Sequence, residues 1–159
     1  MTRNELMAYL AGSMDSDGTV GIKRSTYAMR ITGDSKSPAY SERLALRHVT
    51  RQVPTLLRRT FGGALYVTKP YAKMGRPLWS WQITDKKAVA CALALLPFLI
   101  VKKAQAKNLL RLRTIKEASK KYRVREGRGH AGSSSRSRKH SAAMEAAYLR
   151  AKSMNHVGT

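Results

Sequence analysis

The segment from Asn4 to Gly18 limits the folds open to this chain more than any other part of its sequence. It reads as a helix over residues 4–16, which Thr2 and Glu5 can begin because they have the spacing of a capping box. Two stripes run along this helix at helical spacing: an apolar stripe of Leu6, Met7, Leu10 and Met14, and a small-residue ridge of Ala8, Gly12 and Ser16. Small ridges allow two helix backbones to approach closely. We therefore expect this helix to pack on its own core with one face and on a partner helix with the other.

The same segment ends in two carboxylates, Asp15 and Asp17, followed by Gly18. A plain helix end followed by a turn, with Gly18 in the left-handed conformation, accounts for the glycine. It does not account for the carboxylates, because they face the negative end of the helix dipole. Acids are also rare in this chain, with 9 Asp+Glu against 31 Lys+Arg. The pair therefore indicates a compensating partner, for which a divalent magnesium or calcium ion is the natural candidate.

The formal net charge of +22 on 159 residues points to a polyanionic partner, nucleic acid first and an anionic membrane surface second. The positive charge is concentrated in two tracts. Residues 43–84 contain eight Lys or Arg and no acid, and residues 102–125 contain ten Lys or Arg against Glu117 alone. A solvated surface usually mixes both signs. The exclusion of acid therefore favours a phosphate-facing surface.

Length and composition narrow the class of protein further. The length fits one domain with a real core, and 43% hydrophobic residues argue against global disorder. Cys91 is the only cysteine, which excludes an intrachain disulfide and a cysteine-based zinc site. The longest apolar run, residues 88–101, is broken by Pro97 and is too short to span a bilayer. We recognise no signal peptide and expect a soluble protein in the reducing cytosol of a cell, an organelle or a phage host, and not a secreted one.

Hydrophobic periodicity predicts the remaining elements. After the first helix we expect strands at 19–31 and 43–49, a short helix at 54–60, strands at 65–69 and 78–84, a helix at 85–96 capped by Asp85, and a helix at 101–121. In the strand 78–84, one face carries Trp79, Trp81 and Ile83, which favours core over a base-stacking platform. The order αββαββα indicates an α+β fold with an antiparallel sheet. We expect a core domain over 1–126, a basic Gly/Ser-rich linker or DNA-ordered loop over 127–141, and a C-terminal helix and tail over 142–159.

The nine residues from Leu10 to Gly18, LAGSMDSDG, resemble the LAGLIDADG signature of homing endonucleases at Leu, Ala, Gly, both Asp and the final Gly. Three later segments resemble further landmarks of that family: Phe61-Gly62-Gly63 before a strand, Trp81 in the fourth strand, and the run from Pro97 to Ala106. Together these segments cover roughly residues 4–112. The sequence departs from the family pattern at Ser13, Met14 and Ser16, which bears on helix packing rather than on the chemistry.

The resemblance implies a saddle-shaped antiparallel sheet that lies in a DNA groove, and a homodimer, because the motif occurs once. It implies that the signature helix forms the subunit interface, for which the candidate residues are Ala8, Ala11, Gly12 and Asp15, with Asp15 in a structural or supporting role. It implies Mg²⁺ as the cofactor, held by the Asp17 carboxylate and the Ser16 backbone carbonyl, with Ca²⁺ supporting binding without cleavage.

The catalytic candidates that follow from the resemblance are Asp17, Lys102 and His48. Lys102 falls where the family has a basic residue near the scissile phosphate, and a plain phosphate contact is the alternative. His48 falls roughly where a polar residue organises solvent, and a DNA or turn contact is the alternative. Gln52 is a weaker substitute for His48.

For DNA recognition we expect the outward faces of the strands, because antiparallel strands fit the major groove. The candidates are Arg24, Arg30, Arg43, Arg47, Tyr66, Thr68, Lys69, Arg76, Ser80 and Gln82. Lys107, Arg111 and Arg113, together with the loop 127–141, are expected to grip phosphates.

The sequence therefore favours a site-specific double-stranded DNA endonuclease that hydrolyses phosphodiester bonds at a long, near-palindromic target. A relative that keeps the fold without cutting, as an RNA maturase or a DNA-binding protein, stays open. A ribosomal-type RNA-binding protein would explain the charge but not the Asp pair. An HNH nuclease needs an ordered His-Asn-His cluster, which His130 and His140 do not supply, and a membrane-surface protein needs an amphipathic anchor that is absent from the sequence.

Overall fold

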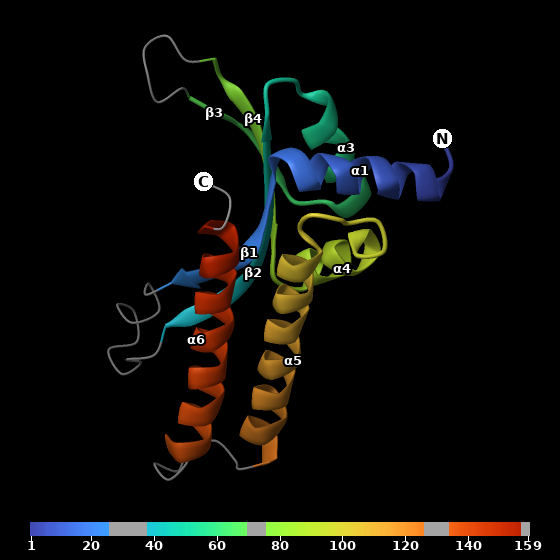
Figure 1. Cartoon of the computed structure of the whole chain (residues 1–159). Helices are drawn as coiled ribbons and strands as arrows, with labels where there is room; N and C mark the ends of the chain where they lie inside the picture. The colour runs from blue at the N-terminus through green and yellow to red at the C-terminus, as the bar shows by residue number, and fades with distance from the viewer. Residues whose placement is uncertain (26–37, 70–75, 126–133, 157–159) are drawn as a thin grey trace.

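The computed structural model describes residues 1–25, 38–69, 76–125 and 134–156 (Figure 1). In chain order its elements are α1 (Arg3–Asp17), β1 (Gly18–Ser25), β2 (Ala39–His48), α3 (Gln52–Phe61), β3 (Ala64–Thr68), β4 (Leu78–Thr84), α4 (Asp85–Leu95), α5 (Lys103–Arg125) and α6 (Ser134–His156). The predicted α+β class and the αββαββα order are confirmed, with α5 and α6 following the core. None of the helices in these ranges is long and apolar enough to cross a membrane.

The four strands form one antiparallel sheet in the order β1-β2-β4-β3. Its register gives the sheet two chemically different faces, because directly paired residues point to the same side. The inner face carries Val20, Leu44, Leu46, Trp81 and Ile83, which are buried. The outer face carries Thr19, Gly21 and Lys23 of β1, Arg43 and Arg47 of β2, Tyr66 and Thr68 of β3, and Ser80 and Gln82 of β4. In Figure 1, α1, α3 and α4 lie together on one side of the sheet, and α5 and α6 run side by side near β1 and β2.

The core lies between the inner face and the helices. Met7, Leu10 and Met14 of α1 are buried there, as the apolar stripe predicts. Trp81 is fully buried with Ile83, and its indole N–H donates to the Gly62 carbonyl at 2.8 Å. The predicted core role of the aromatic face is therefore confirmed for these two residues.

Different local interactions begin α1 and end it. The predicted capping box of Thr2 and Glu5 is present, with both reciprocal bonds formed. Gly18 is not left-handed, since its φ is −81° and its ψ is 163°. A Cβ there would lie 2.6 Å from the Met14 carbonyl oxygen. Glycine is therefore needed because the strand leaves the helix in close contact with it, and not for a positive φ.

The long helices α5 and α6 have their own contacts. Tyr40, Leu112 and Ala147 form a small second cluster between β2, α5 and α6. On the inner face, the fully buried Glu42 accepts a hydrogen bond from Lys116 at 2.7 Å and lies 3.7 Å from the Arg113 guanidinium. This buried acid fixes the register of α5 on β2, because its charge needs both cations nearby.

Several element boundaries differ from the predictions. Strand β2 begins at Ala39, inside the predicted loop, and α6 begins at Ser134, before the predicted Ala142. Asp85 does not cap α4: Thr84 is the N-cap residue, and Asp85 is the first helical residue, at φ 56°. Residues 26–31 of the predicted first strand and 127–133 of the predicted loop lie outside the described residues. The division into three parts stays a prediction.

Candidate functional site

The C-terminal end of α1 is held by Lys102, which arrives from the turn before α5. Its ammonium group donates to the Met14 carbonyl at 2.8 Å, to the Asp15 carbonyl, and to the Ser16 carbonyl at 3.5 Å. The last turn of α1 contains no basic residue of its own. Lys102 thus supplies from elsewhere in the chain the positive charge that the carbonyl end of a helix attracts. Burial lowers the pKa of Lys102, and the nearby Asp15 and Asp17 oppose that shift.

Asp15 joins α1 to the same turn from the other direction. Its carboxylate accepts the backbone N–H of Ile100 at 2.7 Å and that of Lys102 at 2.8 Å. Backbone donors before a helix are otherwise without intrahelical partners, and a carboxylate satisfies them well. These bonds fit the structural role that the sequence suggested for Asp15.

Asp17 and Ser16 remain exposed at the tip of the helix. The Ser16 hydroxyl donates to the Asp17 carboxylate at 3.3 Å. The Asp17 carboxylate and the Ser16 carbonyl are hard oxygen donors of the kind that Mg²⁺ and Ca²⁺ take. The same helix end already attracts the Lys102 ammonium, so the donor set fits a cation. Within the described residues of one chain, no group of three His, Cys, Asp or Glu side chains is placed to hold a metal ion.

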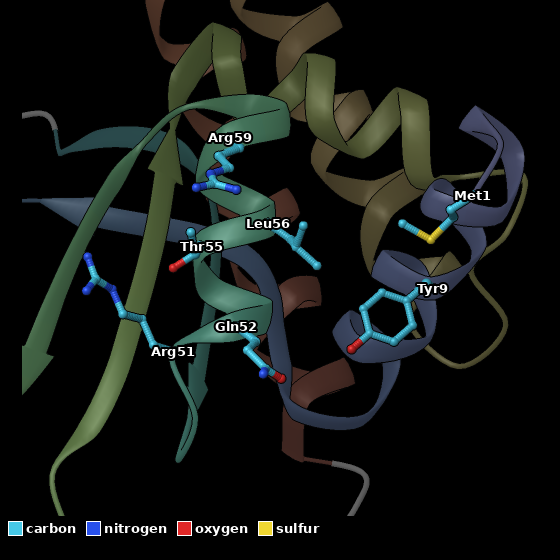
Figure 2. A pocket seen from close by; sticks show the side chains of 7 residues that line it. All are labelled: Met1, Tyr9, Arg51, Gln52, Thr55, Leu56 and Arg59. Carbon is cyan, nitrogen blue, oxygen red and sulfur yellow. The ribbon is translucent and has the colours of Figure 1, made fainter.

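His48 ends β2 near the start of β1, because the β1–β2 ladder pairs Gly18 with Leu46. Its Nδ1 accepts the backbone N–H of Thr50 at 3.0 Å and lies 2.9 Å from the Thr50 hydroxyl. These contacts fix the ring against its own turn. Gln52 is exposed at the start of α3, in a groove that α3 shares with α1 (Figure 2). The catalytic role of His48 stays a prediction.

The outer face brings together most of the predicted DNA-reading residues. Arg43, Arg47, Tyr66, Thr68, Ser80 and Gln82 share this face by strand register. Arg43 donates to the Gln82 side-chain oxygen at 3.3 Å, and the Tyr66 hydroxyl lies 3.5 Å from the same oxygen. Lys69 is exposed just beyond β3, and Arg76 is exposed before β4. This face therefore presents several cations together with the Gln82 amide.

Two of the predicted readers are placed differently. Arg24 points to the inner side, since it pairs with the buried Tyr40; its guanidinium lies 3.3 Å from Glu145 and over the Tyr148 ring of α6. Ser80 is on the outer face but only 2% exposed, and its hydroxyl is hydrogen-bonded to Thr68, so it supports the face from below. Arg30 lies outside the described residues.

Lys23 is the outer-face cation that sequence reasoning missed. It is exposed and pairs across the ladder with Ser41. The signal was available, because strict alternation from the buried Val20 puts Lys23 outside and Arg24 inside.

The predicted phosphate grips divide in a similar way. Lys107 and Arg111 are exposed on α5. Arg113 is engaged within the chain, at 2.6 Å from Glu117 and 3.7 Å from Glu42. Arg113 is therefore not a free phosphate ligand.

Of the predicted interface residues on α1, some are exposed and one is buried in its own chain. Ala8 and Gly12 are exposed, and a Cβ at Gly12 would meet nothing within 4 Å. Ala11 is 0% exposed and belongs to the core of its own chain, so it is not available to a partner. Helical periodicity places Ala11 with Met7 and Met14 rather than with the small ridge.

Comparisons with known proteins agree with this architecture. No family model and no curated protein sequence matches the chain. The solved structure of the homing endonuclease I-CvuI in complex with its target in the presence of calcium matches 74% of this chain and 71% of its own, at TM-score 0.57 and 20% identity. The archaeal intron-encoded homing endonuclease I-Vdi141I, complexed with DNA, matches 99% of this chain and 89% of its own, at TM-score 0.67 and 9% identity.

A third solved structure differs in length. The LAGLIDADG homing endonuclease I-LtrWI, bound to target DNA, matches 74% of this chain but only 39% of its own, at TM-score 0.52 and 16% identity. With identities of 9–20%, these three matches show a shared fold and no more. The chain has the fold of the LAGLIDADG homing endonucleases.

Proposed function

We propose that this chain is a divalent-metal-dependent endonuclease that cuts double-stranded DNA as a homodimer, at a long and near-palindromic site. The observation that carries the proposal is the end of α1. There the exposed Asp17 carboxylate, the Ser16 carbonyl at the helix end and the half-buried Lys102 ammonium meet where α1 runs directly into β1. The fold shared with homing endonucleases that are complexed with DNA supports the same conclusion.

The outer face supports duplex DNA as the partner. Its cations, Lys23, Arg43 and Arg47, lie on antiparallel strands, which suit the major groove. Gln82, held by Arg43 and Tyr66, offers an amide for base recognition. The net charge of +22 supplies the sequence-independent attraction.

The exposed face of α1 supports a second copy of the chain as the other partner. The small residues Ala8 and Gly12 are uncovered, and Tyr9 beside them is 50% exposed. Tyr9 and Leu56 border a groove of about 690 Å³ between α1 and α3 (Figure 2). At the other end of the helix, Ile100 and Val101 expose 84% and 68% of their surface beside Asp15. An apolar border around a small-residue ridge is what a helix-to-helix interface needs.

In such a dimer, Asp17 would face Asp17 of the partner subunit, and two like charges at an interface need a cation between them. The carboxylate and the Ser16 carbonyl would hold a divalent ion, which when bound activates water and stabilises charge on the leaving oxygen. Asp15 holds the turn that carries Lys102, and so keeps the ammonium beside the Asp17 end of α1. From there Lys102 would stabilise the negative charge that develops on the phosphate.

The test is selection of cleaved sites from a randomised duplex library with magnesium, and with calcium as the control for binding alone. We expect cleavage with magnesium at sites that have two-fold symmetry. Binding to the library without cleavage in either magnesium or calcium would support the non-cleaving alternative, an RNA maturase or DNA-binding protein. Cleaved sites without symmetry would contradict the homodimer.

A further inference from the structure

We infer that the C-terminal part of α6 extends the DNA-contacting surface around the edge strand β1, with Lys152 gripping backbone phosphates and Asn155 reaching the adjacent nucleotides. The inference rests on the proposed DNA binding of the outer face and adds a helix to it. The sequence offered no sign of this role, because residues 142–154 read only as a final helix.

The position of α6 relative to the two faces carries the inference. The middle of the helix packs at the inner side, where Tyr148 lies beside Tyr40 and under Arg24. Its last turns reach the outer side instead. A Cβ built on Gly21, an outer-face residue, would lie 3.4 Å from the Asn155 amide nitrogen. The helix therefore lies against the edge strand β1, with Tyr148 at the inner side and Asn155 at the outer side.

A cleft of about 270 Å³ marks the place where α6 meets the outer face. Its polar lining comes from Thr19, Lys23 and Arg43 of the sheet and from Lys152 and Asn155 of the helix. Three of these side chains are cations, and none of the residues that line the cleft is an acid. Lys23 and Lys152 are exposed. A cleft with this lining attracts an anion, and its continuity with Arg43 makes the phosphates of the same duplex the matching ligand.

Contacts on the far side of α6 hold the helix in this position. Glu145 pairs with Arg24 at 3.3 Å and accepts a hydrogen bond from the Tyr40 hydroxyl. The amide of the buried Asn108 donates to the Ala147 carbonyl at 2.8 Å. Because these three contacts come from β1, β2 and α5, Lys152 and Asn155 are presented on a supported helix rather than on a loose tail.

The chemistry of the two side chains suggests different tasks. The lysine ammonium is a compact charge on a flexible stem, which suits a phosphate whose position varies with the DNA. The Asn155 amide can donate and accept at once, so it can meet a sugar, a phosphate or a base edge.

A cysteine-protection experiment tests the inference. The natural cysteine should react little with an alkylating reagent, because Cys91 is buried and the pKa of its thiol is raised to about 12. The variants are Lys152→Cys and, as the matched control, Lys87→Cys, at an exposed lysine of α4 on the other side of the sheet. We would measure the rate at which iodoacetamide alkylates each thiol, with and without saturating random-sequence duplex DNA. We expect DNA to slow alkylation at position 152 and to leave position 87 unchanged.

The salt dependence of binding supplies the second measurement. Replacing one phosphate contact makes the slope of log K against log salt shallower by about one per subunit. We expect this change in Lys152→Ala and not in Lys87→Ala, which removes the same charge. Equal behaviour of the two positions, while the natural chain binds duplex DNA, would overturn the role of α6 and leave the proposed function standing. Tighter binding by Lys152→Ala would also overturn it, since α6 would then obstruct the DNA. No binding by the natural chain would overturn the proposed function together with this inference.

Discussion

Replacing Lys102 by methionine removes the charge that holds the end of α1 and keeps most of the side-chain volume. The lost contacts are the hydrogen bond to the Met14 carbonyl at 2.8 Å and those to the Asp15 and Ser16 carbonyls. A hydrogen bond to a charged group contributes about 1.5–3 kcal/mol, and a cation at a helix C-terminus adds about 0.3–1 kcal/mol. The Met14 carbonyl also accepts the Gly18 N–H, and Ser16 is open to water, so the carbonyls keep other partners. We therefore expect the free energy of unfolding to fall by about 2 kcal/mol.

For a chain of this size, that loss lowers Tm by about 4–8 °C. The assay is urea unfolding followed by circular dichroism, at one fixed protein concentration because the stability of the proposed dimer would depend on it. Lys103→Met is the matched control, since Lys103 is exposed and next in the chain, and a surface change of this kind stays within about 0.5 kcal/mol. Equal stability of the two variants would show that Lys102 does not stabilise the end of α1.

Three further outcomes follow from particular contacts. Glu42→Gln should cost about 3 kcal/mol of unfolding free energy, because it removes the buried carboxylate that pairs with Lys116 and Arg113. Urea unfolding measures this loss, and a loss near zero would mean that the pair with Lys116 is not formed. Cys91 should resist iodoacetamide until the chain unfolds, and rapid alkylation of the native chain would contradict its burial. Burial raises the pKa of the Cys91 thiol to about 12 from an ordinary 9.0. The contribution of the buried thiol to stability should therefore be complete below pH 9 and decline as the pH rises towards 12. Lys23→Ala should weaken DNA binding with little change in Tm, whereas Arg24→Ala should lower Tm because it removes the ion pair that holds α6. Binding titrations and thermal melts measure the two effects. The reverse pattern would contradict the assignment of Lys23 to the outer face and Arg24 to the inner face.

Local patterns predicted much of this fold correctly because their causes are local. The capping box of Thr2 and Glu5 and the apolar stripe of α1 depend on residues three or four apart. The strand Leu78–Thr84 has the predicted bounds, and its alternation separates the buried Trp81 from Gln82 on the outer face. Asp17 was identified through the motif in which it lies, and the structure places it at an exposed helix end.

The features that could not be predicted from local patterns depend on partners distant in sequence. One further error came from overlooking which strand residues alternate to the inner face. The predicted strand 43–49 leaves Glu42 out, and the burial of this acid depends on Lys116, 74 residues later in the chain. The hydrogen bonds to the carbonyl end of α1 come from Lys102, 88 residues after Met14, and no local pattern in the helix predicts them. Arg24 was chosen for its charge, although alternation from Val20 assigns it to the inner face. Arginine at a strand end is as suited to an ion pair with a helix as to DNA.

We propose that the exposed end of α1 is the catalytic centre and that the outer face is the binding surface. Asp17→Asn separates the two, because the amide keeps the shape of the side chain and removes the charge that would hold a divalent ion. The most direct measurement compares this variant with the natural chain on one selected duplex, with binding titrated in calcium and cleavage followed in magnesium. We predict binding within about threefold of the natural chain, since the outer face is untouched, and no detectable cleavage. Cleavage at the natural rate by the purified variant would contradict the catalytic role of Asp17.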